Sequence, residues 1–253
     1  MSHECIPSVT KTSLLLHTLA FTWSCFGIYH DRTHYISPNF KTYGGRFKYL
    51  TLCSAYISLI AYGFATLSDF YNILTDDKNK KFDKNGYPKA NQSRLISIRD
   101  YVITTFVSSL SLVVVIMFWG VAAVDVEGIH PAEHQKLVPL FGWYNHFLHT
   151  TPVLVTLTLL TKINYRFSSI LVSLITVIGM GGLYFCWMSH LATIFGEWPY
   201  GFLDNMPTEV FIVFILCVHG FIAVAHLFTR MISSIIWNEK SREDLATRHK
   251  KKM

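Results

Sequence analysis

One short polar segment carries the side chains of this chain that are best suited to chemistry. It reads Asn145-His146-Phe147-Leu148-His149-Thr150-Thr151 and opens an apolar stretch that continues past Pro152. Two histidines and an asparagine are costly to place in a membrane-length helix, so such groups usually face a bundle interior or a wet cavity. A neutral imidazole is a good general base because its pKa lies near neutrality. The segment therefore predicts proton-transfer chemistry, with His149 as a candidate base.

A nucleophile for this base is expected at the same depth. Thr51 lies at the start of another apolar stretch, and a threonine hydroxyl becomes a useful nucleophile when a base takes its proton. Counted from Trp143, an interfacial aromatic residue, His149 is about 9 Å deep at 1.5 Å per residue. Thr51 and His149 together would suit acyl transfer, in which an ester is cleaved through an acyl-threonine. Other hydroxyls and histidines compete for both roles, and the chain has no G-x-S-x-G elbow.

The histidines also allow a metal site. His146 and His149 are separated by three positions, and His130 and His134 by four. Membrane oxygenases and desaturases hold two irons with several such pairs, but this chain has neither an HExxH motif nor a recurring HxxHH pair. Most of its histidines also lie towards the lumenal side of the membrane in the orientation derived below, whereas this class keeps its histidine pairs on the cytoplasmic side. We therefore expect no metal and no cofactor.

The composition indicates a membrane protein that would position these side chains. The chain is 51% hydrophobic and 15% charged, whereas a soluble domain is roughly 25% charged. We expect an all-α, polytopic six-transmembrane-helix bundle in one domain, with residues 230–253 as a basic tail. The first apolar window is too long and too aromatic for a signal peptide. The windows long enough to cross a bilayer are residues 13–29, 49–67, 101–124, 140–161, 168–188 and 211–229.

The lysines and arginines predict the orientation of the bundle. The termini and the even-numbered connections hold 17 of them, against 5 on the other side. Because cytoplasmic loops are enriched in these residues, both termini should be cytoplasmic. Thr51 and His149 then lie towards the lumenal or external side, and the sequon Asn91-Gln92-Ser93 stays unmodified in the cytoplasm. The net charge of +6 is thus a topology signal, and we expect no nucleic-acid partner.

Several motifs, in their order and spacing, resemble one family. Residues 41–51 read KTYGGRFKYLT, which resembles the T-Y-G-G-x-[WF]-K-[FY]-L-T segment of the androgen-induced gene family. This family includes the androgen-dependent tissue factor pathway inhibitor regulating protein. Residues 145–151 resemble its N-H-x-x-H-T-T motif, and residues 186–190 its C-W-x-x-H motif. Shorter matches lie at residues 67–69 and 97–100, and the order, spacing and hydropathy match the family over roughly residues 13–238.

The resemblance implies a function for the polar residues. Family members are described as six-helix membrane proteins that hydrolyse fatty acid esters of hydroxy fatty acids, and the motifs place the nucleophile at Thr51 and the base at His149. The substrate would be a lipid, and the resemblance names no protein partner for this chain. The chain departs from the family pattern at Arg46 and Gly201, near the expected entrance, which puts the substrate range in doubt.

Five further residues near the same end are supporting candidates: Lys48, Arg46, Asn145, His146 and His190. Lys48, with Arg46 as the second choice, would hold a substrate carboxylate. Each is equally suited to anchoring the helix at the membrane interface. Asn145 or His146 would orient His149 or donate to the oxyanion, and the sequence favours neither over structural packing. For His190, the simpler interpretation is a structural histidine that is hydrogen-bonded at the end of a helix.

A function of a different class stays open. Polar stripes along the helices would suit a small channel, or the chain would be a non-enzymatic scaffold that regulates a partner, although no helix carries repeated charge. The ending Lys250-Lys251-Lys252-Met253 resembles a dilysine retrieval signal of the endoplasmic reticulum, and a basic tail drawn to anionic lipid is the other interpretation. We expect a multi-pass protein of the endoplasmic reticulum, with the cell membrane as a second location.

Overall fold

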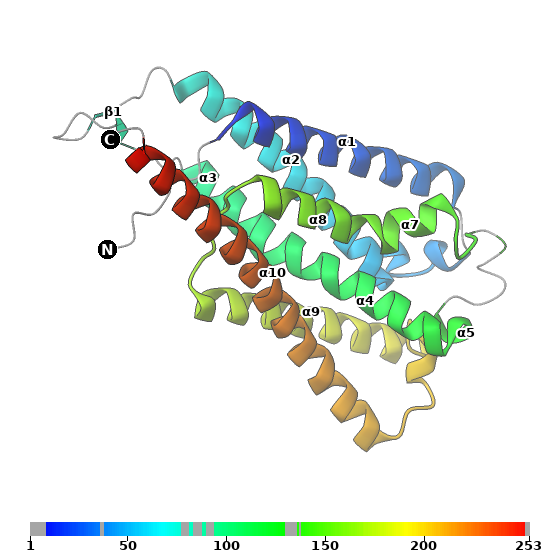
Figure 1. The fold of residues 1–253 in the computed structure, drawn as a ribbon. Coiled ribbons are helices and arrows are strands. Elements are labelled where there is room, and N and C mark those ends of the chain that lie inside the picture. The colour runs from blue at the N-terminus through cyan, green and yellow to red at the C-terminus, as the bar shows by residue number, and fades with distance from the viewer. Residues whose placement is uncertain are drawn as a thin grey trace.

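The computed structural model describes residues 9–35, 38–76, 81–82, 88–89, 94–129, 136 and 138–250; for residues 38, 76, 81–82, 88–89, 128–129 and 238–250 it describes the backbone alone. The described chain is almost entirely helical (Figure 1). Its helices are α1 (Lys11–His34), α2 (Leu50–Asp76), α3 (Arg94–Tyr101), α4 (Ser108–Val124), α5 (Val126–Ile129), α7 (Trp143–His149), α8 (Thr151–Lys162), α9 (Ile170–Phe195) and α10 (Thr208–Lys250).

Short elements connect these helices. A π-helical segment, η3 (Val102–Val107), joins α3 to α4. A pair of two-residue antiparallel strands, β1 (Lys81–Phe82) and β2 (Pro88–Lys89), lies between α2 and α3. The 3-10 turns are η1 (Pro38–Lys41), η2 (Gly45–Lys48) and η4 (Gly201–Leu203). Successive long helices run in alternating directions, so α1 begins and α10 ends at the same end of the bundle (Figure 1).

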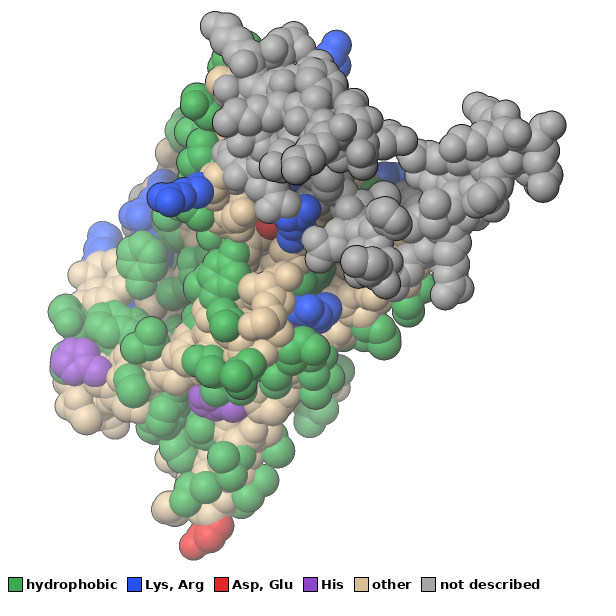
Figure 2. Space-filling model, turned by 90° about the vertical axis from the view of Figure 1, so that its left-hand side faces the viewer, with side chains coloured by type: hydrophobic (Ala, Val, Ile, Leu, Met, Phe, Trp, Pro, Cys, Tyr) green, Lys and Arg blue, Asp and Glu red, His purple; other side chains and the backbone are tan. Residues whose placement is uncertain are grey.

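Among the described residues, four helical stretches are long and apolar enough to cross a membrane: Leu50–Thr75, Arg94–Val124, Ile170–Phe195 and Thr208–Trp237. Large apolar side chains on these helices face outwards, among them Leu171 and Leu216, which are 69% and 67% exposed. Figure 2 shows hydrophobic side chains over much of one face, with Lys and Arg gathered towards its upper part. Because water would disfavour so much exposed apolar surface, the structure indicates a multi-pass membrane protein.

Two of the six expected windows correspond to less apolar elements. Helix α1 covers residues 13–29, but it buries Ser13, His17 and Ser24. The window 140–161 predicts one helix, whereas the structure divides it into α7 and α8 at Thr150, where φ is −135° and ψ is −51°. Pro152 explains the break, because it has no N–H to donate to the carbonyl four residues earlier.

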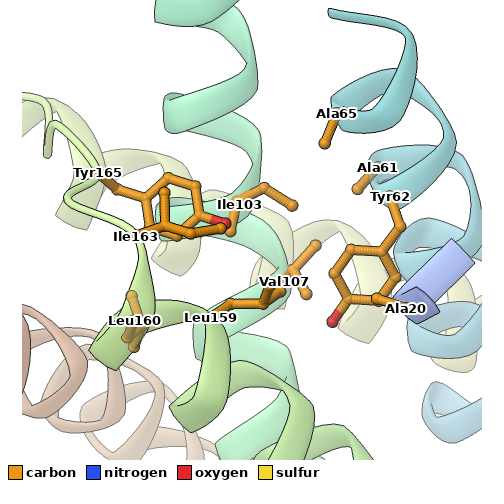
Figure 3. Close-up of a cluster of buried hydrophobic side chains, with 10 residues drawn as sticks. All are labelled: Ala20, Ala61, Tyr62, Ala65, Ile103, Val107, Leu159, Leu160, Ile163 and Tyr165. Carbon is orange, nitrogen blue, oxygen red and sulfur yellow. The ribbon is translucent and has the colours of Figure 1, made fainter. Parts of the chain in front are cut away.

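The core joins helices that are distant in the sequence. Figure 3 shows Tyr62 of α2 and Leu159 of α8 packed with side chains of α1 and η3. Three small residues, Ala20, Ala61 and Ala65, are buried in this cluster, and small side chains let helix backbones approach closely in membranes. A second cluster, which includes Val113, Val177, Ile222 and Ala225, joins α4, α9 and α10.

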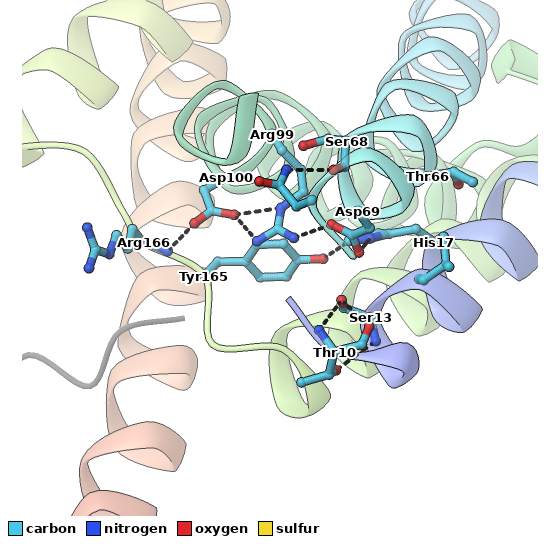
Figure 4. Close-up of polar contacts among 12 residues, drawn as sticks. Thr10, Ser13, His17, Thr66, Ser68, Asp69, Arg99, Asp100, Tyr165 and Arg166 are labelled. Carbon is cyan, nitrogen blue, oxygen red and sulfur yellow. Dashed lines mark hydrogen bonds and ion pairs between the residues drawn. The ribbon is translucent and has the colours of Figure 1, made fainter. Parts of the chain in front are cut away.

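A buried ion network closes the end of the bundle where α2 ends and α3 begins (Figure 4). The Arg99 guanidinium donates to the carboxylates of Asp69 and Asp100. The Asp69 carboxylate also accepts from His17 Nδ1 at 2.9 Å, and His17 Nε2 lies 2.5 Å from the Tyr165 hydroxyl. The charged side chains are at most 1% exposed. Asp69 and Asp100 therefore tie α1, α2, α3 and the α8–α9 connection together at a distance from Thr51.

Candidate functional site

A glycine turn leads the chain into α2. Gly44 and Gly45 have φ values of 80° and 50°, a region that residues with a Cβ rarely adopt. The turn follows η1 and starts η2, and an added Cβ at Gly44 would lie 3.0 Å from Leu191 of α9. The glycines thus allow the segment before α2 to pack closely against α9.

Side chains from α9 and the loop after it hold the start of α2. Tyr184 donates its hydroxyl hydrogen to the carbonyl of Lys48 at 2.9 Å, and the backbone N–H of Leu50 donates to the hydroxyl of Tyr200 at 3.0 Å. Burial raises the pKa of Tyr200 to about 12, so this hydroxyl stays neutral. The Trp187 indole N–H donates to the carbonyl of Phe47 at 2.9 Å. These bonds position Thr51, the second residue of α2.

Thr51 contacts a histidine of α7. Its Oγ1 lies 3.2 Å from Nε2 of His149, the last residue of α7. Nδ1 of the same ring lies 2.8 Å from Oδ1 of Asn145, one helical turn earlier. The Asn145 side chain is fully buried, and that of His149 is 8% exposed. The three side chains form a continuous chain of hydrogen bonds.

The direction of these hydrogen bonds follows from Asn145. Its Nδ2 lies 2.7 Å from the carbonyl oxygen of Leu140, and a carbonyl only accepts, so the amide oxygen is the atom that faces His149. His149 Nδ1 must then carry the hydrogen, and Nε2 of the neutral ring has the lone pair. The lone pair faces the Thr51 hydroxyl, which is the geometry of a general base and a nucleophile.

Two aromatic residues of α4 contact His149, one at its ring and one at its backbone carbonyl. The ring of Phe118 stacks on the imidazole, with centroids 3.5 Å apart and planes at 11°. The Trp119 indole N–H donates to the carbonyl of His149 at 2.7 Å and approaches the Thr150 hydroxyl at 3.2 Å. The helix break at Thr150 makes this carbonyl accessible to a side chain. Both the ring and the backbone of His149 are thus fixed by α4.

The three hydrogen-bonded side chains lie at the wall of a large cavity. Thr51, Asn145 and His149 line a space of about 860 Å³ between α2, α4, α7, α9 and α10. Among its described lining residues none is Lys, Arg, Asp or Glu. This size and apolar lining are typical of a small-molecule site, and the chemistry fits a lipid chain. The apolar lining includes Leu110, Val113, Met117, Val121, Met180, Leu183, Phe214 and Ile222.

Arg46 and Lys48 lie near this end of the bundle but do not line the cavity. Arg46 donates to the buried carboxylate of Asp31 and to the carbonyl of Tyr35. Lys48 Nζ donates to the Thr42 hydroxyl and lies 4.1 Å from the ring centroid of Phe195. Burial lowers the pKa of Lys48, and Glu197 partly opposes this effect. Both residues have structural partners, so their role as carboxylate anchors stays a prediction.

The other two candidates also lie outside the cavity lining. His146 Nδ1 is 2.9 Å from the Thr150 hydroxyl, and its ring stacks on Trp119 at 5.7 Å. His190 is exposed on α9, with Nε2 3.4 Å from the Tyr43 hydroxyl. The structure therefore groups Asn145, and not His146 or His190, with Thr51 and His149.

Sequence reasoning missed three residues of the cavity and its surroundings: Phe118, Trp119 and His219. Phe118 and Trp119 belong to a continuous apolar stretch, so nothing in their spacing distinguishes them. His219 of α10 lines the cavity, and the signal for it is a histidine that interrupts an apolar stretch. Within the described ranges, no group of three or more His, Cys, Asp or Glu side chains is arranged to hold a metal ion. His130 and His134 lie outside the described residues.

Comparisons with known proteins agree with the motifs. The family model described as FAR-17a/AIG1-like protein matches residues 12–234. The human androgen-induced gene 1 protein is 28% identical over 82% of this chain and 84% of its own length. The mouse androgen-dependent TFPI-regulating protein is 26% identical over 90% and 95%, and its human counterpart 24% identical over 91% and 96%. No solved structure matches. The chain belongs to the FAR-17a/AIG1-like protein family.

Proposed function

We propose that this protein is an intramembrane hydrolase that cleaves fatty acid esters of hydroxy fatty acids, with Thr51 as nucleophile and His149 as base. The observation that carries the proposal is the hydrogen-bonded series Thr51–His149–Asn145 at the wall of an apolar cavity of about 860 Å³. A nucleophile, its base and a residue that orients the base are the parts that acyl transfer requires. The cavity supplies space for the lipid chains.

The first half of the reaction forms an acyl-threonine. Thr51 Oγ1 attacks the ester carbonyl carbon while His149 Nε2 takes the hydroxyl proton. The tetrahedral intermediate then breaks its bond to the alkoxy oxygen, and His149 returns the proton to that oxygen. The hydroxy fatty acid leaves, and the acyl group stays on Thr51. Asn145 holds the ring throughout, because its amide oxygen accepts the Nδ1 hydrogen.

The start of α2 is suited to stabilising the oxyanion. Thr51 lies in the first turn, where backbone N–H groups point out of the helix and the dipole is positive. The Leu50 N–H is taken by Tyr200, and the carbonyls of Phe47 and Lys48 accept from Trp187 and Tyr184. The N–H groups of Thr51 and Leu52 are therefore the candidates for donating to the oxyanion.

The second half of the reaction releases the acid. A water molecule gives a proton to His149 Nε2 and attacks the acyl carbon, and the collapse of this intermediate breaks the bond to Thr51 Oγ1. The proton returns to the threonine, and the fatty acid leaves. The site uses side chains and water alone in this scheme.

The proposed topology has six membrane crossings with both termini in the cytoplasm. The alternating directions of the long helices support it, as does the bias of Lys and Arg towards one side (Figure 1). The reactive pair then lies near the lumenal side of the endoplasmic reticulum. Lys251, Lys252 and Met253 of the proposed retrieval signal lie outside the described residues, and replacing Lys250 and Lys251 with Ser should release a retrieved protein to the cell surface.

A fluorophosphonate lipid probe tests the activity directly. The purified wild-type protein should be modified at Thr51, as mass spectrometry of its peptides would show. The Thr51→Ala and His149→Ala variants should stay unlabelled, because the first lacks the nucleophile and the second lacks the base. A folded wild-type protein that neither reacts with the probe nor hydrolyses the ester would contradict the proposal and favour a regulator or a channel.

A further inference from the structure

His219 is a polar side chain deep in the same cavity. It lies on α10, 11 positions after Thr208, where the helix begins, which is about 16 Å along the helix axis at 1.5 Å per residue. The residue is half-buried and lines the cavity together with Val218 and Ile222. A histidine in such a place is costly unless it has a partner, so its hydrogen bonds decide what it does.

One nitrogen of this ring is already used. Nδ1 lies 2.8 Å from the carbonyl oxygen of Ile215, one turn earlier on α10. Because a carbonyl only accepts, Nδ1 carries a hydrogen, and Nε2 of the neutral ring has a lone pair. Within the described part of the chain, the bond to Ile215 is the only hydrogen bond of His219. Nε2 is thus an acceptor for a group that enters the cavity.

The opposite wall leaves space beside this nitrogen. Gly181 of α9 faces His219, and a Cβ added there would lie 3.4 Å from Nε2 and 2.8 Å from Ile222. A larger residue at position 181 would therefore crowd the imidazole and narrow the cavity. The glycine keeps the space next to Nε2 open to a ligand chain.

Three tyrosine hydroxyls that line the cavity already have partners. Tyr184 and Tyr200 bind the start of α2, and the Tyr144 hydroxyl donates to Asp31 at 2.6 Å. Since no described lining residue is Lys, Arg, Asp or Glu, the cavity offers no charged anchor. His219 is thus a neutral acceptor in the described lining, away from the proposed reactive pair.

We infer that His219 binds an O–H group on the lipid chain of the substrate, either a carboxyl group in its acid form or an alcohol hydroxyl. The inference rests on the proposed function, with the ester at Thr51 and the chain that bears the O–H group running along the cavity towards α10. The O–H group donates to Nε2. This assignment differs from the expectation that Lys48 or Arg46 binds the polar end of the substrate, since neither residue lines the cavity.

Three esters with the same reacting bond and different chain ends test this inference: one chain ends in a carboxyl group, one in a hydroxyl and one in a methyl. The wild-type protein should prefer at least one of the O–H substrates to the methyl-ended ester by roughly five- to tenfold in kcat/KM, through a lower KM. His219→Leu should abolish this preference, because leucine accepts no hydrogen bond. His219→Gln should restore part of it, since an amide oxygen accepts.

The preference, measured as a ratio within each variant, separates recognition from general damage to the fold. Val218→Ala, at the adjacent lining position, should keep the wild-type ratio. An unchanged ratio in His219→Leu, or a wild-type protein that favours the methyl-ended ester, overturns the inference and leaves the hydrolase proposal intact. Comparing the carboxyl and hydroxyl substrates shows which O–H source is bound.

Failure of the proposed function gives a different result. A wild-type protein that hydrolyses none of the three esters overturns the hydrolase proposal. The role of His219 is then tested by the binding of the corresponding non-hydrolysable ethers. Tighter binding of an O–H ether than of the methyl-ended ether, lost in His219→Leu, supports the site, and equal binding of all three ethers overturns it.

Discussion

The carboxamide oxygen of Asn145 accepts the Nδ1 hydrogen of His149 at 2.8 Å, and this bond turns the Nε2 lone pair towards Thr51. Asn145 occupies the place that a carboxylate takes in a Ser-His-Asp triad, as asparagine does in papain-like proteases. An amide orients the ring without placing a charge in the membrane, where an ion costs several kcal/mol to desolvate. The arrangement explains how the His149 ring is oriented towards Thr51 without an acidic residue.

Removing either member of the pair should abolish ester hydrolysis. We expect Thr51→Ala and His149→Ala each to lower kcat by about 10³-fold or more, and the double variant to be no worse than either, because a nucleophile and its base act as one unit. Thr66→Ala, which removes an α2 hydroxyl bonded to its own helix, is the matched control. Substantial turnover by Thr51→Ala would rule out the assignment.

Asn145 should act on the rate rather than on substrate binding. In Asn145→Ala the ring loses the acceptor that selects its tautomer, so we expect kcat to fall about 10- to 100-fold with KM changed less than about twofold. Asn145→Asp should restore part of the rate. Its carboxylate favours the imidazolium form of His149, so the loss of activity on acidification should begin at a higher pH. Equal effects on kcat and on thermal stability in all variants would indicate a merely structural role.

The hydrogen bond between Trp119 and the carbonyl of His149 should support the helix break. Trp119→Phe keeps the ring packing but removes the donor at 2.7 Å, which leaves a carbonyl without that partner in an apolar region. We expect a loss of about 1–3 kcal/mol in the free energy of unfolding and a fall in kcat. Thermal unfolding in detergent and steady-state kinetics measure the two effects. A variant as stable and as active as the wild type would show that this bond is dispensable.

The buried ion network should stabilise the fold without taking part in the reaction. Arg99→Leu leaves the carboxylates of Asp69 and Asp100 without their guanidinium, and breaking a buried pair in this way costs about 3–5 kcal/mol. Arg94→Leu, an exposed position on the same helix, should cost less than about 0.5 kcal/mol. Asp69 is 18 positions after Thr51 on α2, or about 27 Å along it, so the folded fraction of Arg99→Leu should keep its kcat.

Glycosylation in a eukaryotic host tests the orientation. Asn91 lies outside the described residues, in the connection between α2 and α3, and the proposed topology keeps it in the cytoplasm and unmodified. Glu133→Asn combined with Gln135→Thr creates a sequon in the connection between α5 and α7, at the opposite side, and this site should be modified. The reverse pattern on a mobility-shift gel would invert the topology and move Thr51 to the other membrane face.

The sequence by itself determined the class of this protein and the segments to which we assign the proposed chemistry. Apolar windows and sparse charge indicate a helical membrane protein, because a bilayer accepts only backbones that satisfy their own hydrogen bonds. The motifs around Thr51 and His149 identified the family, which the family model confirms. Helix periodicity also put Asn145 on the same face as His149.

Only the tertiary structure decided which side chains meet. Thr51 and His149 are 98 residues apart, and their contact depends on the tilt and rotation of two helices, which spacing along one helix does not determine. The same holds for the Phe118 ring against His149, for the choice of Asn145 over His146, and for His219 beside Gly181. Each of these arises from packing between helices, where many residues of similar polarity compete and the shape of the neighbouring helix selects among them.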